Sequence, residues 1–220
     1  ALKAWPLCNI GKFVSLRREP FGPAGDCPSG KGVERLTMTD KRTAERLLDE
    51  VLGALSGDAW TVTLDRLEAP TYLTDIDGNV TYWNRACVDF AGREPELGHD
   101  KWCVTWKLYT TQGDPLPHES CPMAIAIKEQ RAIRDCIAIA ERPDGSRRAF
   151  RPYPTPLFDP AGTLKGAVNM LIDVTAEQDR ELRGQAERCR RLARSVTDAQ
   201  ASRVLDDMAI GYERSAASLA

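Results

Sequence analysis

A histidine and a cysteine stand three residues apart in the segment PLPHESCPMA, at His118 and Cys121. Imidazole and thiolate groups at this spacing suit a metal ion, a haem iron or a reactive thiol. A metal site needs three or four protein ligands, and the only other histidine, His99, lies in a different segment. The alternative is a stiff turn in which Pro122 starts a helix and Cys121 is buried as a small apolar residue. We favour this structural interpretation and expect no metal site.

Aromatic residues concentrate around the same part of the chain. Tyr72 and several tryptophans could stack on a planar ligand, or they could fill a small core, which is their commoner use. Asn169 stands between apolar neighbours in AVNML, so its amide is either satisfied locally or directed at a ligand. The candidate ligand-binding residues are Tyr72, Trp83, Trp102, Trp106, His118, Cys121, Met123 and Asn169.

The composition argues against several classes of function. A net charge of −2 over 220 residues gives no general attraction to nucleic acid or to an anionic membrane. No run approaches eighteen apolar residues, so we expect no membrane span. The seven cysteines include no CxxC pair, which argues against a zinc ribbon and favours reduced thiols in a cytoplasmic protein. No Ser-His-Asp or paired-carboxylate constellation is visible, so we expect no catalysis.

Four regions follow one another along the chain. Residues 1–37 are rich in glycine and proline without hydrophobic periodicity, which indicates a disordered segment or tail. Residues 38–60 predict an amphipathic helix, residues 61–175 a mixed domain, and residues 176–220 C-terminal helices. The first helix has an apolar stripe formed by Leu47, Leu48, Val51, Leu52 and Leu55. A second, heptad-like stripe follows the mixed domain and comprises Leu182, Ala186, Cys189, Ala193 and Val196.

The mixed domain alternates short strands with helices. Asp77-Gly78 predicts a hairpin between strands near residues 70–76 and 79–83. Short helices are expected over ACVDFAG and EPELGHDKW, then a long loop over TWKLYTTQGDPLPHES and a helix over CPMAIAIKEQ. Three further strands are expected over IRDCIAIAER, RRAFRPYPTPLF and LKGAVNMLIDV. Five antiparallel strands with inserted helices give an α+β fold, and a hollow between sheet and helices could hold a small molecule.

Three motifs of this domain match a known family. TDIDGNVTYWNRA fits an opening hairpin of the pattern D-x-x-G-x-I-x-x-x-N-x-A through Asp75, Gly78, Val80, Asn84 and Ala86. ERPDGSRRAF fits a later turn, and GAVNMLIDVTAEQ fits a last strand that ends in an Asp-Val-Thr exit. With these motifs the chain resembles a PAS domain of the kind found in bacterial sensory proteins, over roughly residues 69–175.

The resemblance implies a sensory module that acts without catalysis and transmits its signal through Asp173 and Thr175 into the following helix. Haem in some PAS domains is held by a histidine on the helix before the third strand, and CPMAIAIKEQ has none, so a haem-based redox or gas sensor would have to use His118 or Cys121. Flavin-binding members need an Asn-Cys-Arg motif, which Cys103 in DKWCVTW lacks, so flavin is not expected. The cofactor, if one binds, stays open.

The two apolar stripes need partners. We expect them to pair between two copies of the chain, because a symmetric dimer is the commonest way to bury such surfaces. A signalling protein could be a further partner. The alternative to a ligand-binding sensor is a dimerisation or adaptor module with a filled core.

Overall fold

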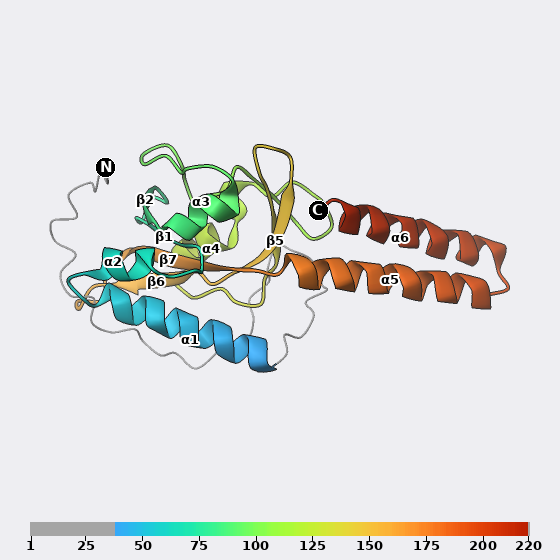
Figure 1. Ribbon diagram of the computed structural model, residues 1–220, viewed down its shortest axis with the longest axis horizontal. Helices are drawn as coiled ribbons and strands as arrows, with labels where there is room; N and C mark the ends of the chain where they lie inside the picture. The colour runs from blue at the N-terminus through green and yellow to red at the C-terminus, as the bar shows by residue number, and fades with distance from the viewer. Residues whose placement is uncertain (1–37, 220) are drawn as a thin grey trace.

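The computed structural model describes residues 38–219, which form a curved antiparallel sheet with helices on both faces (Figure 1). The expected tail, residues 1–37, lies outside the described residues. The helices are α1 (Met38–Leu55), α2 (Trp60–Asp65), α3 (Arg85–Ala91), α4 (Pro122–Glu129), α5 (Thr175–Ser195) and α6 (Ala199–Ala217), with a 3-10 turn at His118–Ser120. The strands are β1 (Thr71–Thr74), β2 (Val80–Trp83), β3 (Lys107–Tyr109), β4 (Ala138–Glu141), β5 (Arg147–Pro152), β6 (Thr155–Phe158) and β7 (Leu164–Asp173). No helix among these residues is long and apolar enough to cross a bilayer.

The sheet has seven strands where the sequence predicted five. Its order is β2-β1-β7-β5-β4-β3, with β6 also paired to β7. The predicted strand over RRAFRPYPTPLF is split into β5 and β6 because Pro152 and Pro154 cannot donate to the ladder. Strand β3 lies in the segment predicted as a loop, and it pairs with β4 at the edge of the sheet. The predicted α+β class is confirmed, and the strand count is corrected.

The corner between β2 and α3 is fixed by Asn84, which is fully buried. Its side-chain oxygen accepts from the backbone N–H of Thr71 at 3.0 Å and of Cys87 at 3.3 Å, which caps α3. Its amide nitrogen donates to carbonyls after α2, including that of Ala69 at 2.9 Å. Asn84 therefore ties α2, β1 and α3 together, and the helix predicted over ACVDFAG ends as expected at Gly92, whose φ is 68°.

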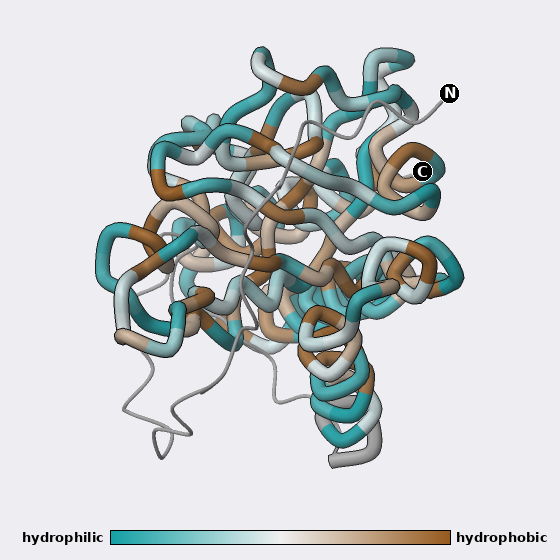
Figure 2. The backbone as a smooth tube through the Cα atoms, turned by 90° about the vertical axis from the view of Figure 1, so that its left-hand side faces the viewer, coloured by the Kyte–Doolittle hydropathy of each residue, from teal (hydrophilic) through white to brown (hydrophobic). Residues whose placement is uncertain are grey.

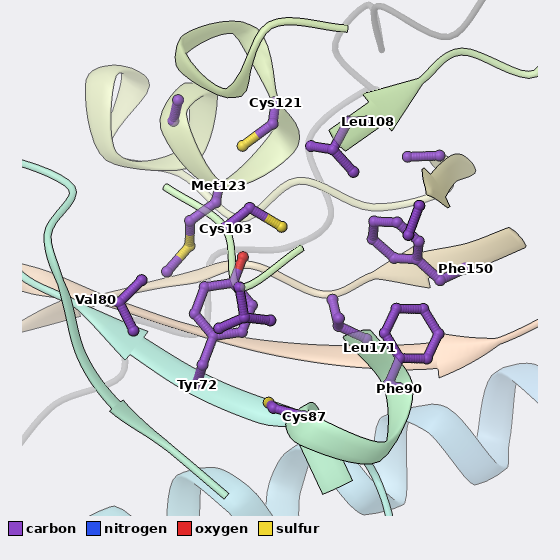
Figure 3. Close-up of a cluster of buried hydrophobic side chains, with 14 of the residues drawn as sticks. Tyr72, Val80, Cys87, Phe90, Cys103, Leu108, Cys121, Met123, Phe150 and Leu171 are labelled. Atoms are coloured by element: carbon purple, nitrogen blue, oxygen red, sulfur yellow. The ribbon is translucent and has the colours of Figure 1, made fainter. Parts of the chain in front are cut away.

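One face of the sheet carries the main hydrophobic core, beneath α3 and α4 (Figure 3). Phe90 of α3 and Phe150 of β5 pack edge to face with ring centroids 5.5 Å apart. In Figure 3 the Tyr72 side chain rises from β1 into this cluster, with its hydroxyl group toward Cys103 and Met123. The cluster, which we call the helix-side core, fills much of the space where the sequence suggested a hollow.

The opposite face is covered by two separate groups of helices. Leu48, Val51 and Leu55 of α1 are buried against the sheet, in a cluster that includes Val168 and Met170 of β7. The turns of α1 alternate between hydrophobic and hydrophilic colours in Figure 2, as expected for an amphipathic helix. The base of the α5–α6 hairpin covers β4 and β5, in a cluster formed by Ile137, Ile139, Ala149, Val174, Leu182, Ala216 and Leu219.

Most of both predicted apolar stripes is therefore packed inside one chain, whereas Val196, the last residue of the second stripe, is 37% exposed. The α1 stripe lies on the sheet, and Ala186 and Cys189 of α5 pack against Ala209 of α6. The two helices run antiparallel, side by side, and extend away from the sheet (Figure 1). The premise that these stripes lack partners within the chain is wrong, because α1 lies on the sheet and the chain folds back at Asp198, which caps α6.

Two local predictions also need correction. The segment EPELGHDKW forms turns and contains no helix, since its backbone is held by the side chain of Asp100 instead. A short helix, α2, lies at the boundary predicted between the N-terminal helix and the mixed domain. Its Leu64 is fully buried in the same cluster as α1.

Candidate functional site

A cavity of about 420 Å³ lies beside the helix-side core, with which it shares Cys103, and we call it the peripheral cavity. Its walls come from two segments, the loop that follows α3 and the turn before α4. The lining residues are Arg93, His99, Asp100, Lys101, Trp102, Cys103, Thr105, Trp106, His118 and Glu119. Two tryptophans thus meet a larger number of charged and polar side chains at one hollow, so the lining is more polar than that of most small-molecule sites.

The loop that forms one wall is held by Asp100. Its carboxylate accepts hydrogen bonds from the Arg93 guanidinium and from the backbone N–H of Glu96, the latter at 2.7 Å. Its backbone carbonyl accepts from Val80 N–H at 3.0 Å, which attaches the loop to β2. The cavity wall is therefore anchored to the sheet.

Trp102 is fixed by the hairpin turn between β1 and β2. Its backbone N–H donates to the Gly78 carbonyl at 2.6 Å, and its own φ is 66°. A Cβ atom at Gly78 would lie 2.4 Å from the Trp102 ring, and Gly78 has a φ of 82°. A side chain at this turn would displace the indole, so glycine is needed both for the turn and for the packing of Trp102.

Two nitrogen atoms in the cavity wall lack hydrogen-bond partners. They are Nε of Arg93 and Nε2 of His118, and both are buried. Burial lowers the pKa of His118, and nearby Arg93 lowers it further, whereas Asp100, Glu119 and the Thr105 backbone oppose the shift. The imidazole is therefore neutral near pH 7. Buried polar atoms are normally paired, so these two are exceptions, as are atoms of Thr74 and Arg151 outside the cavity.

Of the predicted ligand-binding residues, only three line this cavity: Trp102, Trp106 and His118. Tyr72, Cys121 and Met123 lie in the helix-side core, and Trp83 packs against its margin. Asn169 is buried on β7, with an exposed fraction of 2%. The eight candidate residues therefore do not line a single cavity of the structure, and their role in ligand binding stays a prediction.

The question raised by His118 and Cys121 has a structural answer. The two residues flank the turn before α4, but Cys121 points into the core, where burial raises the pKa of its thiol to about 12. Pro122 occupies the first turn of α4, as expected. Cys121 is thus a protonated, buried thiol, and only His118 of the pair reaches the cavity. No group of three or more potential metal ligands exists among residues 38–219.

The expectation of reduced cysteines holds at four residues and fails at one. Cys87, Cys103, Cys121 and Cys189 carry free thiols, whereas Cys136 is disulfide-bonded. The free thiol of Cys103 lies in the cavity wall and accepts a hydrogen bond from the Thr105 hydroxyl at 3.2 Å.

A buried chain of hydrogen bonds joins the cavity wall to the last strand. The Asn169 amide donates to the Tyr72 hydroxyl at 3.0 Å, and that hydroxyl donates to the Trp102 carbonyl at 3.0 Å. The Asn169 oxygen accepts from the backbone N–H of Tyr153 at 2.9 Å. The Asn169 amide is therefore satisfied locally, and we call these contacts the Trp102–Tyr72–Asn169 chain.

The predicted signal exit, Asp173 and Thr175, joins β5 to the start of α5. Asp173 accepts from Arg148 at 2.9 Å and from the backbone N–H of Thr175 at 2.9 Å. The Thr175 hydroxyl lies 2.6 Å from the Asp173 carboxylate and accepts from the Ala149 N–H at 3.1 Å. The first turn of α5 is thus attached to the sheet through side chains as well as through the backbone.

Sequence reasoning missed most of the polar cavity wall. Arg93, Asp100, Lys101 and Glu119 were not predicted, and His99 was considered only as a distant histidine. Their signal was weak, since ion pairs between loop residues leave no periodic pattern. Arg93 and Asp100 are seven residues apart and meet only because the loop curls back on itself.

Comparison with known proteins agrees with this architecture. A family model described as "PAS fold" matches residues 64–179, and no curated protein matches significantly. Similar solved structures include the PAS domain of a protein from Colwellia psychrerythraea, with 16% identity, 51% of this chain and 91% of that chain covered, and a TM-score of 0.36. Others are a LOV protein from Rhodobacter sphaeroides (13% identity, 80% and 94% covered, TM-score 0.42) and the PAS domain of the fruit-fly ELK potassium channel (12%, 63% and 98%, 0.42). Because the family match spans more than half of the chain, the protein belongs to the PAS fold family.

Proposed function

We propose that the protein is a non-catalytic sensory module whose ligand binds in the peripheral cavity. The observation that carries this proposal is the cavity itself, about 420 Å³ in volume, in which Trp102 and Trp106 meet charged and polar side chains. A cytoplasmic location remains part of the proposal.

Non-catalytic action is supported by the state of the groups around the cavity. The Cys121 thiol, three residues after His118, is buried in the core, where burial raises its pKa to about 12, so it stays protonated and is a poor nucleophile. Recognition of a ligand needs only directed hydrogen bonds and aromatic surface, which the wall supplies.

The Trp102–Tyr72–Asn169 chain gives the proposed signal a physical route. Trp102 lines the cavity, and its carbonyl is held by Tyr72, which is held in turn by Asn169 on β7. Strand β7 continues to Asp173 and α5. A ligand that moves Trp102 would strain this buried chain and shift the balance between two packings of the sheet against α5.

Ligand screening combined with hydrogen exchange tests the proposal. A chemically mixed library is screened by thermal shift, and each stabilising compound is then followed by amide exchange. We expect bound compounds to protect residues 93–106 and to alter exchange at the start of α5. If every stabilising compound protects only residues outside the cavity wall, or no compound stabilises the protein, the proposal is rejected.

We further propose that two copies of the module associate, through a face that the sequence did not identify. Leu192 of α5, Val196 directly after α5, and Val204 and Met208 of α6 are apolar but exposed by 37–53%. The helical period places Leu192 on α5, and Val204 and Met208 on α6, on the side of the hairpin away from the Arg190–Glu213 ion pair. This apolar hairpin face suits a two-fold contact between copies.

Sedimentation of matched variants tests the association. The double substitution Leu192→Glu with Met208→Glu should convert a dimer to a monomer. Ile210→Glu is the control, because Ile210 is 48% exposed on the other side of α6. A monomeric unmodified protein at tens of micromolar, or equal disruption by the control, would refute the dimer and leave the adaptor alternative without support.

A further inference from the structure

The base of the α5–α6 hairpin lies against the sheet (Figure 1), and a second cavity, of about 230 Å³, lies at this junction. Its walls come from β3 and the turn after it, from β4 and β5, and from both helices of the hairpin. We call it the hairpin cavity. It shares no lining residue with the peripheral cavity, so the two are separate. A ligand in the hairpin cavity would contact the sheet and the hairpin at once.

The charged part of this lining consists of two arginines, Arg147 and Arg214, without a carboxylate. Arg147 is held by Glu141, whose carboxylate accepts from its Nε at 3.0 Å and from its Nη2 at 2.7 Å. The same carboxylate pairs with Lys107 at 3.2 Å, so these two cations and one anion keep a net charge of +1. Arg214 is exposed on α6 and has no acidic partner among residues 38–219. The cavity therefore has excess positive charge.

Both guanidinium groups offer nitrogen atoms that a ligand can reach. Arg147 Nη1 is not used by Glu141 and, within the described part of the chain, is neither hydrogen-bonded nor covered by other atoms. The Arg147 guanidinium also lies 4.1 Å from the centroid of the Tyr109 ring, which fixes its plane. Because Arg147 and Arg214 line one cavity of only about 230 Å³, a single small group can lie between them.

The helix ends at the cavity do not supply the charge preference. Helix α5 begins at Thr175, so its partly positive end faces this junction, whereas α6 ends there at Ala217 with its partly negative end. Two dipoles of opposite sign roughly offset each other. The sign of the ligand is therefore decided by the arginine side chains, which favour an anion.

The uncharged polar side chains indicate which kind of anion fits. The hydroxyl groups of Thr111 and Ser215 and the amide of Gln178 line the cavity, make no hydrogen bond to another described residue, and are not covered. With the two arginines they can donate to several acceptor oxygens at once. A phosphate group presents more acceptor oxygens and more charge than a carboxylate, and it suits the forked geometry of a guanidinium.

We propose that the hairpin cavity is a second ligand site, which binds a phosphate group between Arg147 of β5 and Arg214 of α6. The bound phosphate joins the sheet to the last turns of α6 and holds the base of the hairpin in place. It thereby regulates the packing of the module without entering the peripheral cavity. The phosphate is either a free ion or part of an organic monoester, whose apolar part would meet three buried side chains of the lining: Ile139, Leu182 and Leu219.

Calorimetric titration with inorganic phosphate and with phenyl phosphate, at constant ionic strength, tests the site on the full chain. Arg214→Gln should weaken the binding of both probes by about tenfold or more, because it removes a charged, forked donor. Arg214→Lys keeps the charge but loses the fork, so it should weaken binding less. Arg203→Gln is the matched control, since Arg203 is also exposed on α6 but does not line the cavity.

Amide exchange with and without phosphate then tests the regulatory effect, which should appear as slower exchange in the last turns of α6. Tighter binding of phenyl phosphate would identify a monoester as the ligand, and tighter binding of inorganic phosphate would identify the free ion. The site is refuted if neither probe binds, or if Arg203→Gln weakens binding as much as Arg214→Gln, which would indicate general attraction only. Binding without slower exchange in α6 would overturn the regulatory role. None of these outcomes bears on the peripheral cavity, which the library screen tests separately.

Discussion

The helix-side core and the peripheral cavity both contain polar groups, but the two regions differ in whether these groups are hydrogen-bonded within the chain. In the core, the Tyr72 hydroxyl and the Asn169 amide are each hydrogen-bonded within the chain. In the cavity, Arg93 and His118 each keep a buried nitrogen without a partner. Unpaired buried atoms also occur at Thr74 and Arg151, outside the cavity, so the case for a ligand site rests on the volume and lining of the cavity and not on unpaired atoms. Judged by polarity alone, Asn169 would be as strong a candidate ligand-binding residue as His118.

The largest expected difference between the two regions concerns aromatic truncation. Phe150→Ala should lower the free energy of unfolding by about 3–5 kcal/mol, because it leaves a cavity beside Phe90 in the core. Trp106→Ala should cost less than about 1 kcal/mol, since its ring is largely exposed on the cavity wall. Urea denaturation of both variants checks the comparison, and similar losses would mean that the cavity wall is part of the core.

A smaller effect is expected when one hydroxyl is removed from the core. Tyr72→Phe leaves the Trp102 carbonyl and an Asn169 N–H without their partner, which should cost about 1–3 kcal/mol. Tyr82→Phe is the matched control, because its hydroxyl bonds to Asp65 at an exposed position. A cost for the control as large as that for Tyr72 would contradict the claim that the buried chain is specifically stabilising.

The smallest effect is a pH dependence that belongs to the cavity. The pKa of His118 is lowered by burial from its ordinary value of 6.5, so the unfolded chain binds a proton more readily than the folded one. Stability contributed by the neutral imidazole is therefore complete above pH 6.5 and decreases as the pH falls below it, down to the folded pKa.

Chemical denaturation between pH 7.5 and pH 5 measures this slope. His118→Gln should make the dependence shallower in that range, and the His118 ring should titrate below pH 6.5 by NMR. A ring that titrates at or above 6.5 in the free protein would show that it is not shielded as described.

The fold was largely predictable because its signals are local. Asp77-Gly78 marks the hairpin, Asn84 and Gly92 bound α3, and Pro122 starts α4. Strand β3 was missed because three residues cannot show an alternating pattern, and it exists through pairing with β4 across 34 positions of sequence between Lys107 and Glu141. The helical stripes were recognised, but their partners depend on the direction of the chain after each helix.

The candidate site was less predictable because its polar residues meet only in the folded chain. Trp102, Trp106 and His118 stood out by type, whereas Arg93 looks like any loop arginine until its buried Nε is seen without an acceptor. Conversely, Asn169 looked unusual on an apolar strand, and its partners Tyr72 and Tyr153 come from strands distant in sequence. Whether a polar group is satisfied is a property of the tertiary structure.

The central claim is that ligand occupies the peripheral cavity and leaves the helix-side core filled. Assigned NMR spectra of the protein titrated with a stabilising compound from the library screen test this most directly. The account predicts shift changes at the indole groups of Trp102 and Trp106 and at the His118 ring, with Phe90 and Phe150 unchanged. Shifts centred on Phe90 and Phe150 would contradict it, because they would place the ligand in the core.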